Sequence, residues 1–221
     1  MKTKLRSLLL APLILAAPAT QAAVVINNLT GGTQAYSESL SGPDGVDDFG
    51  DPYNDHEIAF SFTTGTTTVN LTEIAFLAFV VGGSTSPIQL SLSTGTTAPG
   101  GTNPLVLGSV TPSGPAFYQT LALTPSSLVT LAANTQYWVH FTVPAGPDIY
   151  TIPNANLPVV DPEWTLGTTL RSDPFTAWEE INTILHPRVR ITVDAVPEPS
   201  ALLLGGCASL CLIARRKRIH A

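Results

Sequence analysis

Short runs of alternating apolar and polar residues recur between residues 23 and 195, and clusters of turn-forming residues separate them. A period of two places one face of a strand against a core and the other in water, as in antiparallel sheets. The runs lie at 57–63, 71–81, 88–93, 104–110, 117–123, 136–143 and 187–193. Gly82-Gly83-Ser84 and similar clusters mark turns. This pattern predicts an all-β fold of about eight to ten strands, an antiparallel, jelly-roll-like β-sandwich.

The amino-terminal residues have the three parts of a secretory signal. Lys2, Lys4 and Arg6 precede an apolar run at 8–17, and small residues continue to Ala22. The apolar run is about half of the ~20 residues that a permanent membrane helix needs. We therefore predict a signal peptide at 1–22, removed by signal peptidase between Ala22 and Ala23 after export across the inner membrane.

The carboxy-terminal residues, 196–221, also have three parts. The motif Pro197-Glu198-Pro199 disfavours a helix, because proline fixes φ and lacks an N–H. A single hydrophobic helix at 201–214 would be about 21 Å long, short against a ~30 Å hydrocarbon core. A basic cluster follows, made of Arg215, Arg216, Lys217 and Arg218. Such a cluster stays on the cytoplasmic side, so residues 23–195 would lie outside the inner membrane.

This three-part end resembles the PEP-CTERM sorting tail of Gram-negative bacteria. In that family exosortase, a membrane-embedded transpeptidase-like enzyme, recognises the motif that matches Pro197, Glu198 and Pro199 here. The resemblance implies a transient inner-membrane anchor, then transfer to the cell surface or extracellular matrix of a host that makes exopolysaccharide. A simple single-pass anchor is the alternative.

Three segments between the two ends resemble the choice-of-anchor R group of surface domains. They read AFSFTTG at 59–65, LTEI at 71–74 and LAANTQYW at 131–138. The resemblance covers roughly residues 25–193, and its motifs are structural. It implies a sandwich fold and no assigned activity.

Charge is distributed unevenly along the chain. Between Arg6 and Arg215, three basic residues (Arg171, Arg188 and Arg190) face all sixteen Asp and Glu residues, a formal balance of −13. A surface this negative repels phosphate backbones, which excludes nucleic acid as a partner.

Cysteine is confined to the tail, at Cys207 and Cys211. The predicted domain at 23–195 therefore has no disulfide framework, thiolate zinc site or cysteine nucleophile. An apolar core has to supply its stability.

The densest acidic stretch carries five aspartates: Asp44, Asp47, Asp48, Asp51 and Asp55. Glu38 and Glu57 would add oxygens, and Ca²⁺ takes six to eight oxygen ligands. The spacing does not match an EF-hand loop. The segment is thus either an exposed acidic turn or a calcium site, with calcium as the one cofactor considered.

Trp164 and Trp178 lie in polar, turn-like sequence with carboxylates nearby, and they are candidate sugar-binding residues. Aromatic faces stack on sugars, and a sandwich offers a platform for them. Packing in a core is the alternative for both. His140 shares a strand face with Trp138 and Thr142, and we assign it a structural role.

The chain has no Gly-x-Ser-x-Gly elbow, while a Ser-His-Asp triad, which is assembled in space, stays open at this point. Glu163, Glu179 and Glu180 are the candidates for a glycosidase pair. Asn28 and Asn70 match the Asn-x-Thr acceptor pattern for glycosylation, whose use after bacterial export is doubtful.

The leading hypothesis is an exported, non-enzymatic cell-surface or biofilm-matrix protein, processed by exosortase and associated with exopolysaccharide or other surface glycans. The second hypothesis is a lectin-like carbohydrate-binding module, with or without calcium. A secreted hydrolase ranks third.

Overall fold

The computed structural model describes residues 22–29, 36–42, 45–46, 52–53, 56–80, 85–96, 99, 104–113, 118–145, 149–155, 159–172, 177–182 and 186–196. One compact unit comprises Gln21–Val196, and a second comprises Met1–Thr20 with Pro197–Ala221. The Pro-Glu-Pro motif, the predicted helix at 201–214 and the basic cluster lie outside the described residues. Among the residues described, no helix is long and apolar enough to cross a membrane.

The described secondary structure is all β, and every strand pair is antiparallel, as the sequence predicts. A nine-stranded sheet contains β1 (Ala23–Asn27), β2 (Tyr36–Ser41), β6 (Val69–Val80), β9 (Tyr118–Leu123), β10 (Val129–Leu131), β12 (Ile149–Ala155), β13 (Val159–Val160), β16 (His186–Pro187) and β17 (Val189–Ala195). A six-stranded sheet contains β5 (Glu57–Thr63), β7 (Ile88–Thr94), β8 (Leu105–Val110), β11 (Gln136–Thr142), β14 (Thr165–Ser172) and β15 (Glu179–Asn182). β3 (Gly45–Val46) and β4 (Pro52–Tyr53) form a separate pair. The described residues form seventeen strands, more than the eight to ten expected, and four of these contain only two residues.

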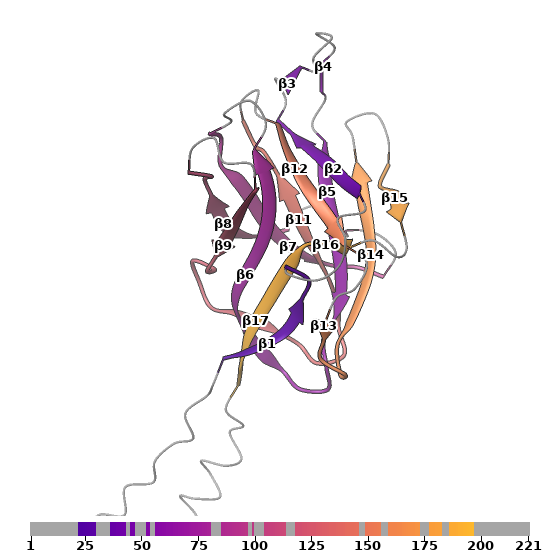
Figure 1. The fold of residues 1–221 in the computed structure, drawn as a ribbon. Coiled ribbons are helices and arrows are strands. Elements are labelled where there is room, and N and C mark those ends of the chain that lie inside the picture. The colour runs from indigo at the N-terminus through magenta and orange to yellow at the C-terminus, as the bar shows by residue number, and fades with distance from the viewer. Residues whose placement is uncertain are drawn as a thin grey trace, which may run out of the picture. The chain divides into compact units, whose positions relative to one another are not determined.

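The two large sheets lie face to face and share one hydrophobic core, an arrangement consistent with a β-sandwich (Figure 1). The strand order of the six-stranded sheet is β15-β14-β5-β11-β7-β8. Its inward residues alternate with outward ones: Ile58, Phe60 and Phe62 of β5 face the core, whereas Ala59 belongs to a small cluster outside it. The period-two pattern in the sequence therefore corresponds to the two faces of this sheet.

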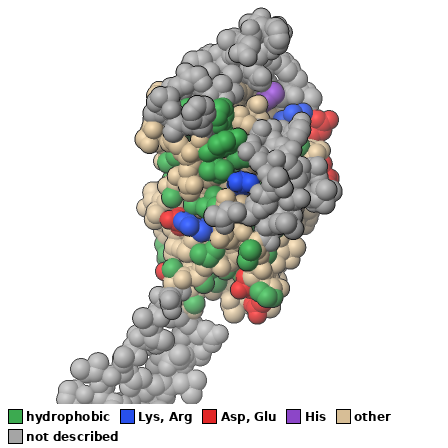
Figure 2. Space-filling view, viewed as in Figure 1, with side chains coloured by type: hydrophobic (Ala, Val, Ile, Leu, Met, Phe, Trp, Pro, Cys, Tyr) green, Lys and Arg blue, Asp and Glu red, His purple; other side chains and the backbone are tan. Residues whose placement is uncertain are grey.

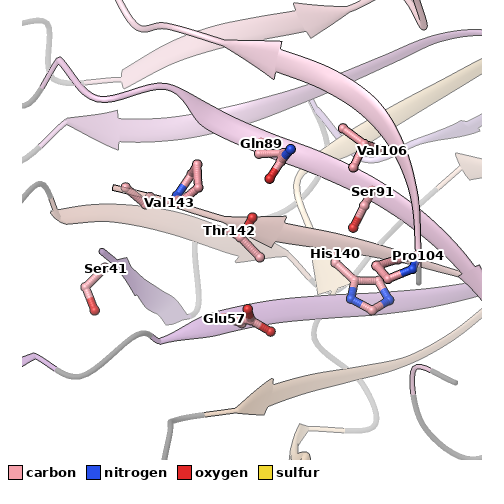
Figure 3. Close-up of a pocket in the computed structure, with 10 residues that line it drawn as sticks. Ser41, Glu57, Gln89, Ser91, Pro104, Val106, His140, Thr142 and Val143 are labelled. Atoms are coloured by element: carbon pink, nitrogen blue, oxygen red, sulfur yellow. The ribbon is translucent and has the colours of Figure 1, made fainter. Parts of the chain in front are cut away.

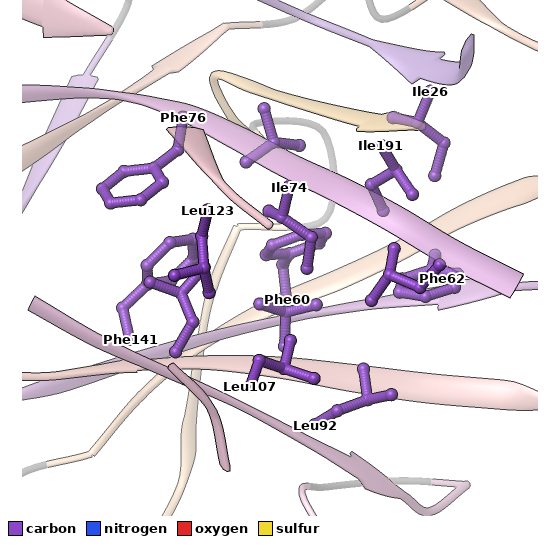
Figure 4. Close-up of a cluster of buried hydrophobic side chains, with 14 of the residues drawn as sticks. Ile26, Phe60, Phe62, Ile74, Phe76, Leu92, Leu107, Leu123, Phe141 and Ile191 are labelled. Atoms are coloured by element: carbon purple, nitrogen blue, oxygen red, sulfur yellow. The ribbon is translucent and has the colours of Figure 1, made fainter. Parts of the chain in front are cut away.

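Aromatic rings from both sheets meet at the centre of the core (Figure 4). The Phe76 ring of β6 lies edge-on to the Phe141 ring of β11, with 5.0 Å between their centroids. Phe60 stacks on Phe141 at 5.9 Å. Each fully buried side chain of this kind contributes roughly 1.5–3 kcal/mol through removal from water.

Two irregularities explain where simple alternation fails. β6 contains one extra residue, Thr72, relative to its partner β17. Thr192 of β17 pairs with Glu73, but the next residue, Val193, pairs with Leu71. The buried positions of β6 therefore change from odd to even numbers along the strand. In β14 a second irregularity falls between Leu166 and Thr169. It includes Gly167, where a Cβ would collide with the Ser61 hydroxyl, so only glycine fits without rearrangement.

The segments that carry the choice-of-anchor resemblance contact one another. Thr64 donates its hydroxyl to Ala132 O at 2.6 Å and accepts from Thr135 N at 2.9 Å. Asn134 N donates to Gly65 O at 2.9 Å, and Asn134 has φ of 50°, a left-handed conformation that asparagine tolerates well. These motif residues therefore fix a turn against the end of β5.

The first and last strands of the compact unit are neighbours. β17 lies between β1 and β6, with Ala23 opposite Val193 and Ala195 opposite Val69. The chain consequently enters and leaves this unit at the same end.

Candidate functional site

A shallow cavity of about 360 Å³ lies on the outward face of the six-stranded sheet. Its lining comprises Ser41, Glu57, Gln89, Ser91, Pro104, Val106, His140, Thr142, Val143 and Pro144, and we call it the His140 groove. Figure 3 shows these side chains on neighbouring strands, around a common space. Most come from β5, β7, β8 and β11, which the register places side by side.

The groove has a buried floor and an exposed rim. Ser91 and His140, opposite each other on β7 and β11, form the floor and are 7% and 8% exposed. Gln89 and Thr142 form the next opposed pair and are half-buried. The rim is apolar and exposed, with Pro104, Val106 and Pro144. A ligand here would meet hydroxyl and amide groups below and apolar atoms at the sides.

The His140 ring is held by two neighbours. Its Nε2 lies 2.8 Å from Ser93 Oγ, and its ring lies edge-on to Trp178 with 5.7 Å between centroids. Burial lowers the pKa of His140 from 6.5 to about 4, because desolvation disfavours the charged imidazolium. The ring is therefore neutral at pH 7.

The Ser93–His140 pair lacks further parts of a nucleophilic site. Ser93 is only 9% exposed and lies within β7, paired with Trp138 of β11 in the sheet. The described contacts of the His140 ring are with Ser93 and Trp178, so no described carboxylate orients it as in a serine-hydrolase triad. The described contact joins the side chains of Ser93 and His140 across β7 and β11.

Trp178 covers a small apolar cluster beside the groove. That cluster contains Ala59, Trp138 and Leu170 on the outward face of the sheet. The Trp138 indole is 1% exposed, and its Nε1 donates to Gly95 O at 3.1 Å. The outward face is thus partly apolar and is covered from outside by Trp178.

Trp164 does not join Trp178 in a sugar platform, which corrects that part of the sequence-based hypothesis. Trp164 is 8% exposed and stacks on Phe62 of the main core, with centroids 5.8 Å apart. Phe62 and Ala59 lie on opposite faces of β5. The two tryptophans therefore contact opposite faces of the sheet, and the packing alternative holds for Trp164.

The three candidate glutamates are not arranged as a glycosidase pair. Glu163 precedes β14 and accepts from Thr66 Oγ1 at 2.9 Å. Glu180 lies opposite Leu170, near the other end of β14 and roughly 20 Å away at ~3.3 Å per residue. Glu179 and Glu180 are successive strand residues and point to opposite faces. Carboxylate pairs in glycosidases are about 5–9.5 Å apart.

Asn28 is a structural residue. It is fully buried, and its Nδ2 lies 3.2 Å from His186 O and 3.1 Å from Pro187 O. Burial lowers the pKa of the neighbouring His186. An amide enclosed in this way does not present a glycosylation acceptor, whereas the half-buried Asn70 accepts from Thr130 Oγ1 at 3.0 Å.

The proposed calcium ligands Asp44, Asp47, Asp48, Asp51 and Asp55 lie outside the described residues. The Glu38 side chain is likewise not described, whereas Glu57 lines the His140 groove. Within the described ranges, no group of three or more His, Cys, Asp or Glu residues could hold a metal ion.

A second cavity, of about 470 Å³, lies where the compact unit begins and ends. Ala23 and Ala195 line it together with Asp161 and Glu163. The first residue after the predicted signal cleavage therefore lies close to two carboxylates.

The face seen in Figure 2 carries few, scattered charges among apolar and uncharged polar side chains. One described ion pair joins Arg190 and Glu73 at 2.8 Å, across the β17–β6 pair.

The groove residues Gln89, Ser91 and Thr142 were not identified from the sequence. Their only sequence signal is their place at the polar positions of the runs 88–93 and 136–143. An ordinary solvent-facing strand has the same pattern, so a hollow between strands cannot be read from it.

No family model matches the sequence, and no curated protein shows a significant match to it. The two family resemblances therefore rest on the motif residues themselves.

Proposed function

We propose that this chain is an exported, non-enzymatic cell-surface or biofilm-matrix protein that exosortase processes and that associates with exopolysaccharide. In this proposal a jelly-roll-like sandwich is flanked by a signal peptide at 1–22 and a sorting tail at 196–221. Signal peptidase and exosortase are its processing partners, and the inner membrane of a Gram-negative host holds it transiently.

One observation carries the proposal. The compact unit comprises Gln21–Val196, with β1 beginning at Ala23 and β17 ending at Ala195. These boundaries coincide with the processing sites predicted from the sequence, after Ala22 and at Pro197–Pro199. Removal of both ends would therefore leave every described strand in place, as a sorted cargo requires.

The non-enzymatic part of the proposal rests on where the candidate catalytic residues lie. Ser93 is buried within β7, and Glu163 is far from Glu180. A lectin-like function is the second candidate, and the His140 groove is the observation that favours it.

The test is the position of the mature termini. The full chain is expressed in an exosortase-positive host and in a matched strain without that enzyme, and intact masses are measured in surface and membrane fractions. We expect an amino terminus at Ala23 in both strains. A carboxyl terminus close to Pro199 should occur only with exosortase.

Two variants sharpen this test. Glu198→Gln should block carboxy-terminal processing, whereas Glu180→Gln, the same chemical change within the β unit, should leave it intact. Inner-membrane retention of a chain that still ends beyond Arg218 in both strains would contradict the proposal and favour the simple anchor.

A further inference from the structure

We propose that the His140 groove binds a neutral saccharide unit of a surface polysaccharide, held by side chains from neighbouring strands of the six-stranded sheet. This inference rests on the proposed function for the source of the ligand. It moves the sugar site away from the Trp164–Trp178 pair suggested by the sequence.

The chemistry of the floor and walls matches a polyhydroxylated ring. Gln89 offers an amide donor and acceptor, Ser91 and Thr142 offer hydroxyls, and Glu57 offers carboxylate acceptors. A sugar ring presents hydroxyls at its edge and C–H groups on its faces. The apolar rim of Pro104, Val106 and Pro144 suits those C–H groups. This mixture of apolar walls and a few convergent polar groups is typical of small-molecule sites.

The charge of the groove selects against acidic ligands. Among the described residues that line the groove there is no lysine or arginine, and Glu57 carries the one carboxylate. His140 is neutral at pH 7, because burial lowers its pKa to about 4. A uronate or phosphorylated sugar would lose water around its charge without gaining a positively charged partner among the described lining residues, and it would lie in the same groove as the Glu57 carboxylate. Neutral sugars carry no such cost.

The geometry also argues against an extended peptide as the ligand. The backbones of β7 and β11 are paired on both sides, β11 with β5 and β7, and β7 with β11 and β8. Neither β7 nor β11 therefore offers a free edge for a peptide to extend the sheet, which ends at β8 on the rim of the groove. Recognition on this face therefore depends on side chains, and a cavity of about 360 Å³ suits a ligand of one or two sugar units.

Binding is tested with the full chain, unprocessed, in a mild detergent. Its affinity is measured by calorimetry against neutral oligosaccharides of glucose, galactose, mannose and N-acetylglucosamine, and against an oligouronate of equal length. We expect at least one neutral series to bind, with an affinity that changes little between low and high salt. The oligouronate should not bind.

The matched variants are Gln89→Ala and Gln136→Ala. Gln89 lines the groove, whereas Gln136 begins β11, on the same sheet face but about 20 Å from Thr142 at ~3.3 Å per residue. Gln89→Ala should weaken binding about tenfold, the equivalent of ~1.4 kcal/mol, and Gln136→Ala should leave it unchanged. Thermal unfolding of both variants checks that the fold persists.

Two outcomes would overturn the inference: no neutral oligosaccharide binds, or binding survives Gln89→Ala as well as it survives Gln136→Ala. Neither outcome depends on exosortase, because the unprocessed chain is used. Sugar binding is therefore tested by calorimetry and sorting by the masses of the mature chain, so either proposal can fail without the other.

Discussion

Burial on the floor of the His140 groove lowers the pKa of the His140 imidazole, because desolvation disfavours its charged form. Ser93 contacts its Nε2, Trp178 contacts its ring, and Glu57 lines the same groove. His140 therefore lies between the small apolar cluster under Trp178 and the rest of the His140 groove.

The lowered pKa of His140 predicts that the protein is less stable in mild acid. The folded state takes up this proton at a pKa of about 4, and an unfolded chain does so near 6.5. Between these values the unfolded state binds more protons, so the free energy of unfolding falls as pH decreases from 7.5 to 4. The full effect is roughly 3 kcal/mol, at ~1.4 kcal/mol per pH unit.

Urea unfolding at pH 7.5, 6, 5 and 4 measures this effect in the native chain and in His140→Gln. The variant should lose a corresponding part of the pH dependence and keep the part due to His186, whose pKa is lowered in the same direction. Equal pH dependence in both proteins would show that His140 does not titrate as its burial implies.

At the scale of elements, the turn between β10 and β11 is fixed by Thr64. Its hydroxyl bonds to Ala132 O and Thr135 N, and the side chain is only 2% exposed. These two hydrogen bonds join residues that are 68 and 71 positions apart in the sequence.

Thr64→Val should therefore destabilise the protein. The substitution keeps the shape of the side chain but removes the partner of Ala132 O and Thr135 N in two partly buried hydrogen bonds, at a cost of about 1–3 kcal/mol. Thr66→Val is the matched control, because Thr66 is exposed and its bond to Glu163 is open to water. Equal unfolding midpoints in urea for the two variants would contradict this role.

Alternating runs in the sequence predicted several strands almost to the residue and missed others. The run 57–63 coincides with β5, and 88–93 and 136–143 each differ from their strands by one residue. β14 was missed because its irregularity at Gly167 interrupts the period of two. β12 contains Pro153, which lacks a donor and argues against a strand, yet its carbonyl accepts from Arg188 N at 2.9 Å.

At the candidate site, prediction from the sequence reached the correct sheet face but not the groove. Alternation placed His140, Trp138 and Thr142 on one face, and the structure agrees. The pairing of β7 with β11 is a long-range contact, so its register could not be obtained from local sequence. Trp164 was considered an exposed aromatic because its neighbours are polar, although Phe62 of another strand buries it.

At the scale of the whole molecule, the compact unit ends at Val196 and predicts which truncations are tolerated. A chain that stops after Val196 keeps all of β17 and should unfold at a temperature within about 2 °C of the full chain, less than ~1 kcal/mol for a chain of this size. A chain that stops after Arg190 loses the buried Ile191 and Val193 and should not fold. Circular dichroism during heating compares the two, and a cooperative transition in the shorter chain would contradict the prediction.

The position of β17 also determines when the fold can be completed during synthesis. A chain made from its amino terminus produces this strand last, yet β17 fills the space between β1 and β6 and bonds to both. Until residues 189–195 are made, β6 lacks the strand that pairs with most of its length, and β1 lacks the strand that joins it to β6. Contacts this distant in sequence form slowly. A nascent chain should therefore stay open until nearly all of it has been made. This would suit the export that we propose, because an unfolded chain can pass through a translocation channel and fold on the far side.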